Sequence, residues 1–400
     1  IDAASERATV KLLASTKENV TISTENVTLD LNGYTLNGST GERKPALTIT
    51  SRVYVKDSSK AQTGTIMRED TKENSGVSSH YVIDVQGGKS GWLFFQGGNV
   101  KNDSGAGGTN GASLVRVGDD KQPGLPHMTI TGGTFTQNNF IVLKCDSGIL
   151  SVAGGTINSA NSYAIQNWKT TYIKDGDKGT SPVINGNVST WTYKGSNSNL
   201  EITGGTVDGN VESVTYDAPE GNTAKVKISG GTVKGQLHTL GYSSSTGTST
   251  EINDPAKATI EIEGGTFSAD PSQYVAGNFA TTQNADGTYG VAQAQPIAQV
   301  GDTSYYTIDE ARDAQAKTGE AITLLRDYTT GSTFNSGTVA RVVDLNGHTW
   351  TCTGTDANSA AFEINNPNAS LTVKNGKIVS SQLVGLIPSA MGGTITYDNS

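Results

Sequence analysis

Several residue types are scarce in this chain. Only two of its 400 residues are cysteines, aromatic residues make up 6% and charged residues 17%. Cys145 and Cys352 lie far apart in the sequence, so we expect them in different structural units and unpaired, and no disulfide framework is expected. Few cysteines and lysines, together with many Thr, Asn and Gly residues, are typical of an exported bacterial protein, and we expect this chain to be one.

Basic clusters and long apolar runs are also missing. The net charge is -9, the isoelectric point is about 5.0, and no run of Lys and Arg exceeds two residues. Nucleic acids and anionic membranes attract clustered positive charge, so neither is an expected partner. No stretch of 18 apolar residues occurs, and we expect no membrane insertion. The chain begins at Ile1 without a signal peptide, so we expect a mature or excised piece of a longer protein.

Glycine is abundant, with 49 residues, and much of it recurs in one pattern. An apolar strand is followed by two glycines, a small polar residue and a β-branched or aromatic residue. The six copies are Trp92–Val100, Met128–Phe135, Leu150–Ile157, Leu200–Val207, Val226–Val233 and Ile260–Phe267. A strand that recurs every roughly 20–50 residues predicts a solenoid. Stacked repeats bury an apolar face that a single repeat cannot bury alone.

Shorter repeats predict the corners of this solenoid. Ile184–Val188, Val207–Val211 and Val233–Leu237 each read apolar, polar, Gly, amide, apolar, at spacings of 23 and 26 residues. Glycine permits the positive φ that a corner between strands requires. One turn should therefore take about 22–26 residues and contain roughly three short strands. The residues expected in one inward apolar ladder are Ile130, Val152, Ile202, Ile228 and Ile262.

Insertions interrupt the repeats at similar points. In the expected register, most of them emerge from one long face of the rod. Insertions on a shared face of a repeat protein often form its binding surface. The insertions are residues 103–113, 169–180, 192–199, 216–225 and 242–257.

A second unit is expected because the start of the first one is duplicated. Asp30-Leu-Asn-Gly-Tyr-Thr35 recurs as Asp344-Leu-Asn-Gly-His-Thr349. Thr307-Ile-Asp-Glu310 reads as a capping box that begins a short helix. Such a helix would cover the open strand edge at the end of a β-solenoid, which otherwise invites aggregation. We therefore expect a first parallel β-helix unit over 1–292 with a truncated N-terminal cap, a linker and unit start over 293–306, and a second, incomplete unit with its capping helix over 307–400.

These motifs carry a family resemblance. The Asp-Leu-Asn-Gly-x-Thr openings, the Gly-Gly-Thr strands and the closing segment 264–291 resemble the right-handed parallel β-helix, or pectate-lyase-like, repeat units of large bacterial cell-surface proteins. The resemblance covers nearly the whole chain and implies an all-β solenoid exported to the bacterial cell surface. It implies no single activity, because the family includes adhesins, structural stalks and proteins of unassigned role.

No complete set of catalytic residues is visible. Hydrolases of this architecture need two carboxylates across the scissile bond, and lyases need a base, often with Ca²⁺ held by carboxylates. The best acidic pairs, Asp119/Asp120 and Asp175/Asp177, stand beside Gly and Lys, and solvated turn carboxylates are the favoured interpretation. We expect no catalytic site, no metal site and no cofactor. The four histidines, none at metal-ligand spacing, are His80, His127, His238 and His348.

Aromatic residues crowd into residues 163–193, which hold two of the four tryptophans. Tryptophan and tyrosine faces bind sugar rings and dominate protein-binding hot spots. Trp168, Tyr172, Trp191 and Tyr193 are therefore the candidate ligand-binding residues. The sharpest hypothesis is a platform formed by Trp168 and Trp191 one turn apart. The favoured alternative is that these rings only pack beneath the insertions.

Three functions stay open at this point. The first is a non-enzymatic surface protein, an adhesin or binding rod that recognises a glycan or protein of a host or neighbouring cell. The second is a carbohydrate-active enzyme, a polysaccharide lyase or glycoside hydrolase, on the same scaffold. The third is a structural spacer of a larger surface protein. Three or more charged groups on one face of adjacent turns would favour the enzyme.

Overall fold

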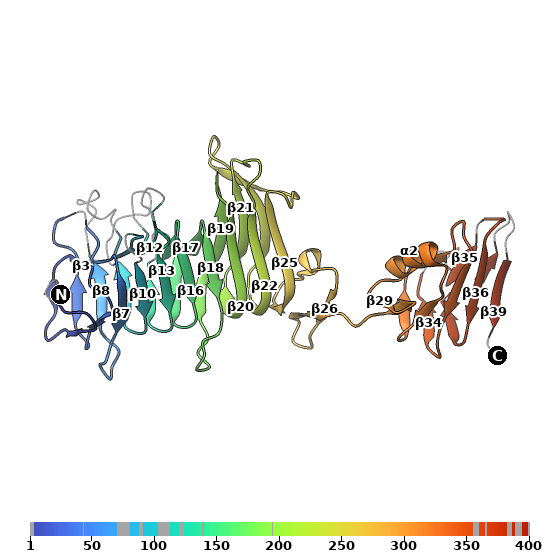
Figure 1. The fold of residues 1–400 in the computed structure, drawn as a ribbon, viewed down its shortest axis with the longest axis horizontal. Coiled ribbons are helices and arrows are strands. Elements are labelled where there is room, and N and C mark those ends of the chain that lie inside the picture. The colour runs from blue at the N-terminus through green and yellow to red at the C-terminus, as the bar shows by residue number, and fades with distance from the viewer. Residues whose placement is uncertain are drawn as a thin grey trace. The chain divides into compact units, whose positions relative to one another are not determined.

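The chain forms an all-β structure, and its described residues include a short capping helix (Figure 1). The computed structural model describes residues 4–42, 44–69, 81–87, 91–102, 113–119, 124–137, 140–193, 195–354, 360–364, 366–381, 386–388 and 394–398. It divides into two compact units, Ile1–Ala292 and Gln293–Ser400. Asp120, His80 and residues 103–112 of the first insertion lie outside the described residues.

The first unit is a right-handed parallel β-helix with three sheets, A, B and C, and each turn passes through them in this order. Sheet A consists of β1 (Thr9–Lys11), β4 (Val27–Asp30), β7 (Arg52–Lys56), β10 (Trp92–Phe95), β13 (His127–Ile130), β16 (Ile149–Val152), β18 (Thr170–Ile173) and the first parts of β20 (Ser198–Asp208), β22 (Ala224–Val233) and β25 (Ala258–Phe267).

The other two sheets follow the same stacking. Sheet B consists of β2 (Thr16–Lys17), β5 (Thr35–Asn37), β8 (Thr65–Arg68), β11 (Asn99–Asn102), β14 (Thr134–Thr136), the first parts of β17 (Thr156–Asn167) and β19 (Val183–Thr192), and the last parts of β20, β22 and β25. Sheet C consists of β3 (Val20–Ile22), β6 (Leu47–Ile49), β9 (Ile83–Val85), β12 (Val115–Val117), β15 (Leu143–Cys145), the last parts of β17 and β19, β21 (Val211–Tyr216) and β23 (Leu237–Ser243).

The predicted inward ladder is confirmed, and it contains one residue more than expected. Ile130 pairs with Val152, Ile202 with Ile228, and Ile228 with Ile262, and all five side chains are fully buried. Between Val152 and Ile202 the structure inserts Ile173 of β18. The prediction that residues 169–180 are an insertion is therefore wrong for 170–173, because this strand lacks the Gly-Gly signature and was not recognisable as a turn of the helix.

The two glycines of the repeat have different physical roles. A Cβ on Gly230 would lie 2.4 Å from the carbonyl oxygen of Thr203 in the turn before it, so the first glycine permits a close approach of two backbones. Gly231 has a φ of +80°, in the left-handed region that L side chains rarely adopt. The second glycine has positive φ in every copy, so the motif marks a sharp corner between sheets A and B.

The corner repeats are stacked by amide side chains. Val188, Val211 and Leu237 share one register in sheet C, as the spacings of 23 and 26 residues predict. The side-chain oxygen of Asn187 accepts a hydrogen bond from the backbone N–H of Asn210 at 3.0 Å, and Asn210 accepts in the same way from Gln236 at 2.9 Å. The amide in this motif thus fixes each corner onto the next one.

Three of the five predicted insertions share one corner of the first unit. Residues 192–199, 216–225 and 242–257 leave sheet C and lead to sheet A, and in Figure 1 they project beyond the neighbouring turns together with β19 and β21. The loop 174–182 instead leads from sheet A to sheet B. The last insertion is a hairpin, with β24 (Thr248–Glu251) antiparallel to β23. The unit closes with η2 (Ser272–Tyr274), β26 (Phe279–Gln283) and β27 (Tyr289–Gln293), and β27 runs antiparallel to β25.

The second unit repeats the architecture on a smaller scale. One sheet holds β28 (Ala298–Val300), β29 (Thr303–Tyr305), β30 (Ile322–Leu324), β33 (Arg341–Asp344), β36 (Ser370–Lys374) and β39 (Thr394–Asp398). Two three-stranded sheets hold β31 (Tyr328–Thr330), β34 (Thr349–Cys352) and β37 (Lys377–Ser380), and β32 (Phe334–Asn335), β35 (Phe362–Ile364) and β38 (Leu386–Pro388). Except for the antiparallel β28 and β29, the strands pair in parallel between turns.

The expected helix is present as α2 (Ile308–Thr318). The Thr307 hydroxyl accepts from the backbone N–H of Glu310, and the Glu310 carboxylate accepts from the Thr307 N–H, each at 3.2 Å, which is the predicted capping box. The helix buries Ile308 and Ala311 and packs on β28, β29 and β30, so it covers one end of the core of this unit.

The duplicated openings also fold alike. The Asp30 carboxylate accepts from the N–H of Asn32 at 3.0 Å, and Asp344 accepts from Asn346 at 2.9 Å. Asn32 and Asn346 both adopt positive φ. Cys145 and Cys352 are buried, unpaired and in different units, as predicted. Burial raises the pKa of the Cys145 thiol to about 12, so it is not a reactive nucleophile.

Candidate ligand-binding site

The four candidate residues lie on two different sheets of the first unit. Trp168 follows the end of β17, Trp191 is the last residue but one of β19, and Tyr193 follows the end of β19, so all three belong to sheet C. Tyr172 is in β18 of sheet A, paired with Ser151 and Glu201. The expectation of one site that includes Tyr172 is therefore corrected: the turn between Trp168 and Thr170 moves the chain from sheet C to sheet A.

Six rings form a cluster on the outer surface of sheet C. Trp191 is central, with ring centroids 5.5 Å from Trp168, 5.5 Å from Tyr242 and 6.1 Å from Tyr163. Tyr216 lies 5.3 Å from Tyr193 and 5.0 Å from Tyr242. These six rings, called the sheet C cluster below, are Tyr163, Trp168, Trp191, Tyr193, Tyr216 and Tyr242.

Tyr216 and Tyr242 were not among the predicted site residues, although the sequence contains a signal for them. Tyr193, Tyr216 and Tyr242 are separated by 23 and 26 residues, the same spacings as the corner repeats. The register of β21 with β23 pairs Tyr216 with Tyr242 directly. A search for aromatic residues at the corner period would therefore have found this row.

The members of the cluster differ in exposure. Trp191 is 7% exposed, whereas Tyr193 is 53% exposed. The Trp191 indole N–H donates to the hydroxyl of Ser189 at 2.8 Å, and the Trp168 indole N–H donates to Gln166 at 3.0 Å. The hypothesis of an open platform of two tryptophans is thus wrong for Trp191, which is buried beneath the rings around it, and for this residue the favoured packing interpretation holds. It supports Trp168, which is half-buried, and does not itself offer a face to solvent.

A hollow of about 390 Å³ opens beside these rings. Trp168, Tyr193 and Tyr216 give it aromatic walls, and Lys144 and Asp146 line it with an ion pair in which Nζ and Oδ1 are 2.9 Å apart. Ser196, from the loop between β19 and β20, completes the lining. The hollow therefore combines flat apolar faces with a cation, an anion and a hydroxyl.

Charged side chains on the outside of sheet C are largely paired with one another. Arg116 contacts Asp84 and Asp119, each at 2.9 Å, and its guanidinium lies 4.4 Å from the ring centroid of Tyr81. Asp119, a member of the best acidic pair in the sequence, thus belongs to an ion-pair network. This arrangement suits a structural role better than proton transfer.

The other acidic pair is on a loop. Asp175 accepts hydrogen bonds from the backbone N–H of Gly205 at 3.0 Å and from the Ser181 hydroxyl at 2.6 Å. These contacts fasten the loop 174–182 to the next turn. Asp177 is exposed on the same loop. The turn interpretation therefore accounts for the position of both carboxylates.

Glu212 is a buried carboxylate that was not among the predicted site residues. It lies on β21 and is 6% exposed, and its oxygen accepts a hydrogen bond from the Tyr163 hydroxyl at 3.0 Å. Burial raises the pKa of Glu212 and also that of Tyr163. His238, one strand further along sheet C, lies 2.6 Å from Glu251. A buried carboxyl, a phenol and a histidine–glutamate pair thus gather beside the sheet C cluster.

The remaining described histidines are scattered. His127 is half-buried in sheet A, with its ring centroid 4.8 Å from that of Trp92. His348 lies 3.5 Å from Asp327 in the second unit. Among the residues that the structure describes, no group of three His, Cys, Asp or Glu residues could hold a metal ion.

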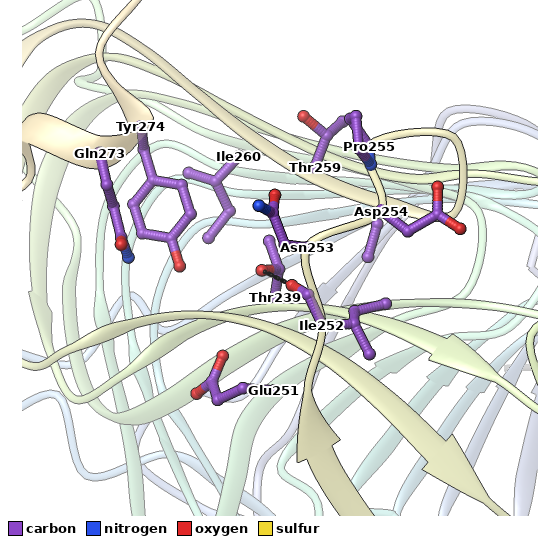
Figure 2. Close-up of a pocket in the computed structure, with 11 residues that line it drawn as sticks. Thr239, Glu251, Ile252, Asn253, Asp254, Pro255, Thr259, Ile260, Gln273 and Tyr274 are labelled. Atoms are coloured by element: carbon purple, nitrogen blue, oxygen red, sulfur yellow. Dashed lines mark hydrogen bonds between the residues drawn. The ribbon is translucent and has the colours of Figure 1, made fainter.

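A pocket of about 600 Å³ lies at the last turn of the first unit (Figure 2). Here sheet C ends at β23, whereas sheet A continues to β25. Figure 2 shows Gln273 and Tyr274 on one side, with Asp254 and Pro255 on the other. The Thr239 hydroxyl donates to the carbonyl of Ile252 at 2.7 Å and so ties the hairpin to the pocket floor. The lining is mostly polar and offers a single aromatic ring.

Comparison of the chain with models of known families, with curated proteins and with solved structures gives no match. Within the described part of the chain, no helix is both long and apolar enough to cross a membrane. Inferences about function therefore depend on the geometry of the sites themselves.

Proposed function

We propose that this chain is an exported bacterial surface protein of the adhesin or binding-rod type. Its β-helix presents the sheet C hollow to a glycan or protein ligand of a host or neighbouring cell. The observation that carries the proposal is the convergence of Trp168, Tyr193 and Tyr216, from successive turns, on a cavity that also contains the Lys144–Asp146 ion pair.

The chemistry of the hollow suits such a ligand. Aromatic faces bind the apolar face of a sugar ring or an apolar side chain, and tyrosines contribute large contact areas at low entropic cost. Lys144 and Asp146 offer a donor and an acceptor for the hydroxyl or amide groups at the edges of the same ligand. The insertions 192–199 and 216–225 border this hollow, and loops on one face of a repeat protein commonly make up its binding surface.

Export to a bacterial cell surface is supported by composition and by the family resemblance of the motifs. The observed parallel β-helix is consistent with a pectate-lyase-like repeat unit. A rod of stacked turns can hold a binding surface away from the cell that carries it, which suits adhesion.

Glycan and host-protein arrays probed with the intact chain test this proposal. Any ligand found should lose affinity at least about tenfold in the Tyr193→Ala/Tyr216→Ala double variant, because two aromatic contacts disappear. Tyr34→Ala is the matched control, since Tyr34 is also an exposed tyrosine of the first unit. Equal affinity of the double variant and the control would refute the hollow as the binding site.

A carbohydrate-active enzyme is the second candidate, and Glu212 is the observation that favours it. A buried carboxyl with a raised pKa next to aromatic rings is a common arrangement for a general acid. It ranks second because Glu212 is nearly inaccessible and its neighbour Glu251 is already engaged by His238. Release of reducing or unsaturated sugars from pectin, alginate or mucin glycans, abolished by Glu212→Gln, would establish it.

A further inference from the structure

A second set of aromatic rings lies on the outside of sheet A, separate from the sheet C cluster. The Tyr54 and Phe94 rings stack with centroids 4.9 Å apart and an interplanar angle of 13°. Trp92 stacks on Phe94 at 5.0 Å, and the Arg52 guanidinium lies 5.1 Å from the centroid of the Trp92 ring. All three rings are half-buried, so each keeps part of its surface in solvent.

The strand register extends this stack into a straight row. Tyr54 pairs with Phe94, Phe94 with Thr129, Thr129 with Ser151, and Ser151 with Tyr172. The alternate positions of these strands are fully buried, so the row faces outward. We call it the sheet A row. It places aromatic residues at both ends and two hydroxyls between them.

The centre of the row is hollowed. A trough of about 420 Å³ lies here, and Asp175, Asp177 and Lys178 of the loop 174–182 form one wall of it. Five other lining residues are Thr129 and Ser151, Gln96 and Thr131 in the adjacent outward positions, and Lys174 at the edge of the loop. Within the described part of the chain, the side chains of these five residues make no hydrogen bond or ion pair. Their donors and acceptors are therefore available to a ligand.

The row changes character immediately beyond Tyr172. The next positions are Glu201, Lys227 and Glu261, and Lys227 forms an ion pair with Glu263 at 2.7 Å. That part is an ordinary solvated face of acidic and basic side chains. The segment of aromatic rings and unpaired hydroxyls is thus limited to the turns from Tyr54 to Tyr172.

We propose that the sheet A row is a second binding site, for a linear oligosaccharide that lies parallel to the axis of the β-helix. Neighbouring turns are roughly 4.8 Å apart, so Phe94 and Tyr172 are separated by roughly 14 Å, a span that a short chain of sugar units covers. The rings stack on sugar faces at the two ends, and the hydroxyl, amide and ammonium groups of the trough bind the sugar hydroxyls between them.

The observations favour a glycan over a protein partner. A protein hot spot is a packed and desolvated apolar pocket. The centre of the sheet A row is instead an open trough, whose strands present hydroxyls and an amide and whose loop wall carries two lysines and two aspartates. This alternation of flat apolar faces and unpaired polar groups matches the surface of a sugar chain. The proposal does not depend on the sheet C hollow.

Binding of oligosaccharides of increasing length tests the proposal. The probes are β-1,4-linked glucose and N-acetylglucosamine oligomers and α-1,4-linked galacturonate oligomers, from disaccharide to hexasaccharide, titrated calorimetrically into the intact chain. At least one series should bind, with affinity that rises until the oligomer spans both ends of the row. Phe94→Ala should weaken all lengths about tenfold, whereas Tyr172→Ala should weaken only the longer oligomers.

Three further variants test whether the oligosaccharide binds at the sheet A row. Ser151→Glu fills the trough without removing a ring, and it should weaken binding. The melting temperature should stay unchanged, because Glu201 already occupies the equivalent outward position of sheet A two turns further along. Glu201→Gln, just beyond the row, should bind as the unaltered chain does. Tyr193→Ala, in the sheet C hollow, should also leave this binding intact.

Several outcomes would overturn the proposal. One is that no oligomer of the three series binds at millimolar concentration. Another is that oligomers bind equally well to the Phe94→Ala, Tyr172→Ala and Ser151→Glu variants. A third is that binding depends on Tyr193 alone, which would support the sheet C hollow and reject the sheet A row. Loss of a protein partner, rather than of oligosaccharide binding, in the Phe94→Ala variant would also reject it.

Discussion

Replacing Trp191 with alanine should destabilise the first unit, whereas replacing Tyr193 should not. Trp191 is 7% exposed and contacts the rings of Tyr163, Trp168 and Tyr242. Removing a buried tryptophan costs about 3–5 kcal/mol of unfolding free energy, since the lost burial is compounded by a cavity. Tyr193 is 53% exposed, and its replacement should change stability by no more than about 0.5 kcal/mol.

Thermal unfolding followed by circular dichroism measures the difference. For a unit of this size, a loss of about 3 kcal/mol lowers the melting temperature by roughly 6 °C. Trp191→Phe keeps the ring packing but loses the N–H that Ser189 accepts, so it should cost only about 1 kcal/mol. This variant separates the contribution of packing from that of the hydrogen bond.

Ligand binding also distinguishes the roles of Trp191 and Tyr193. Tyr193→Ala should lose affinity for a ligand of the sheet C hollow while it keeps the melting temperature. Trp191→Ala should lose both, because Trp168 loses the ring that supports it. If Trp191→Ala melts like the unaltered chain and loses only affinity, Trp191 contacts the ligand directly and its assignment as a buried support is wrong.

Three other predictions concern burial and charge. Ile228→Asp should cost more than about 4 kcal/mol by placing an unpaired charge inside the ladder, and Ile228→Val only about 1 kcal/mol; similar melting temperatures would contradict the ladder. Burial acts to raise the pKa of Asp57, but hydrogen bonds from backbone N–H groups, including that of Gly64, outweigh burial and lower the pKa. The ionised Asp57 therefore stabilises the folded state above about pH 4, and this stabilisation is lost as the pH falls below that. The melting temperature of Asp57→Asn should therefore lie below that of the unaltered chain at pH 6 and approach it at pH 3, and a gap independent of pH would refute this. Glu212 should show the opposite pH dependence, because burial raises its pKa and folding favours its protonated form. The Glu212→Gln variant should therefore gain stability relative to the unaltered chain as the pH rises from about 4 to 7. The control variant Glu220→Gln, at an exposed position, should show no such gain.

The repeat architecture could be predicted because each of its devices is local. The Gly-Gly pair is needed for a close backbone approach and a positive φ, and the corner amide bonds the N–H of the next corner. Each device uses a particular residue type at a fixed spacing, so the sequence shows it directly. The capping box of α2 was predictable for the same reason. The turn that contains Ile173 was not predicted, because it lacks the glycine pair. It shares with the other turns only the alternation of buried and outward side chains in its strand.

The candidate sites were predictable only in part. Aromatic density in residues 163–193 identified the sheet C cluster, but it grouped Tyr172 with rings that face another direction. Tyr216, Tyr242 and Glu212 come from later turns, and the sequence does not show that they meet Trp191.

By itself, the sequence determined that this chain is a parallel β-helix with a capped second unit, because period, glycine and capping residues act through neighbours along the chain or one turn away. Only the tertiary structure decided which outward residues share a sheet, how deeply each ring is buried, and where polar groups are left unpaired. A shift of one residue at a corner moves the residue beside it to the neighbouring sheet and turns the side chains that follow to the opposite face, and local sequence does not reveal that shift. For this reason Trp191 is a buried support, Tyr193 is an exposed wall of the hollow, and Tyr172 ends the row on sheet A.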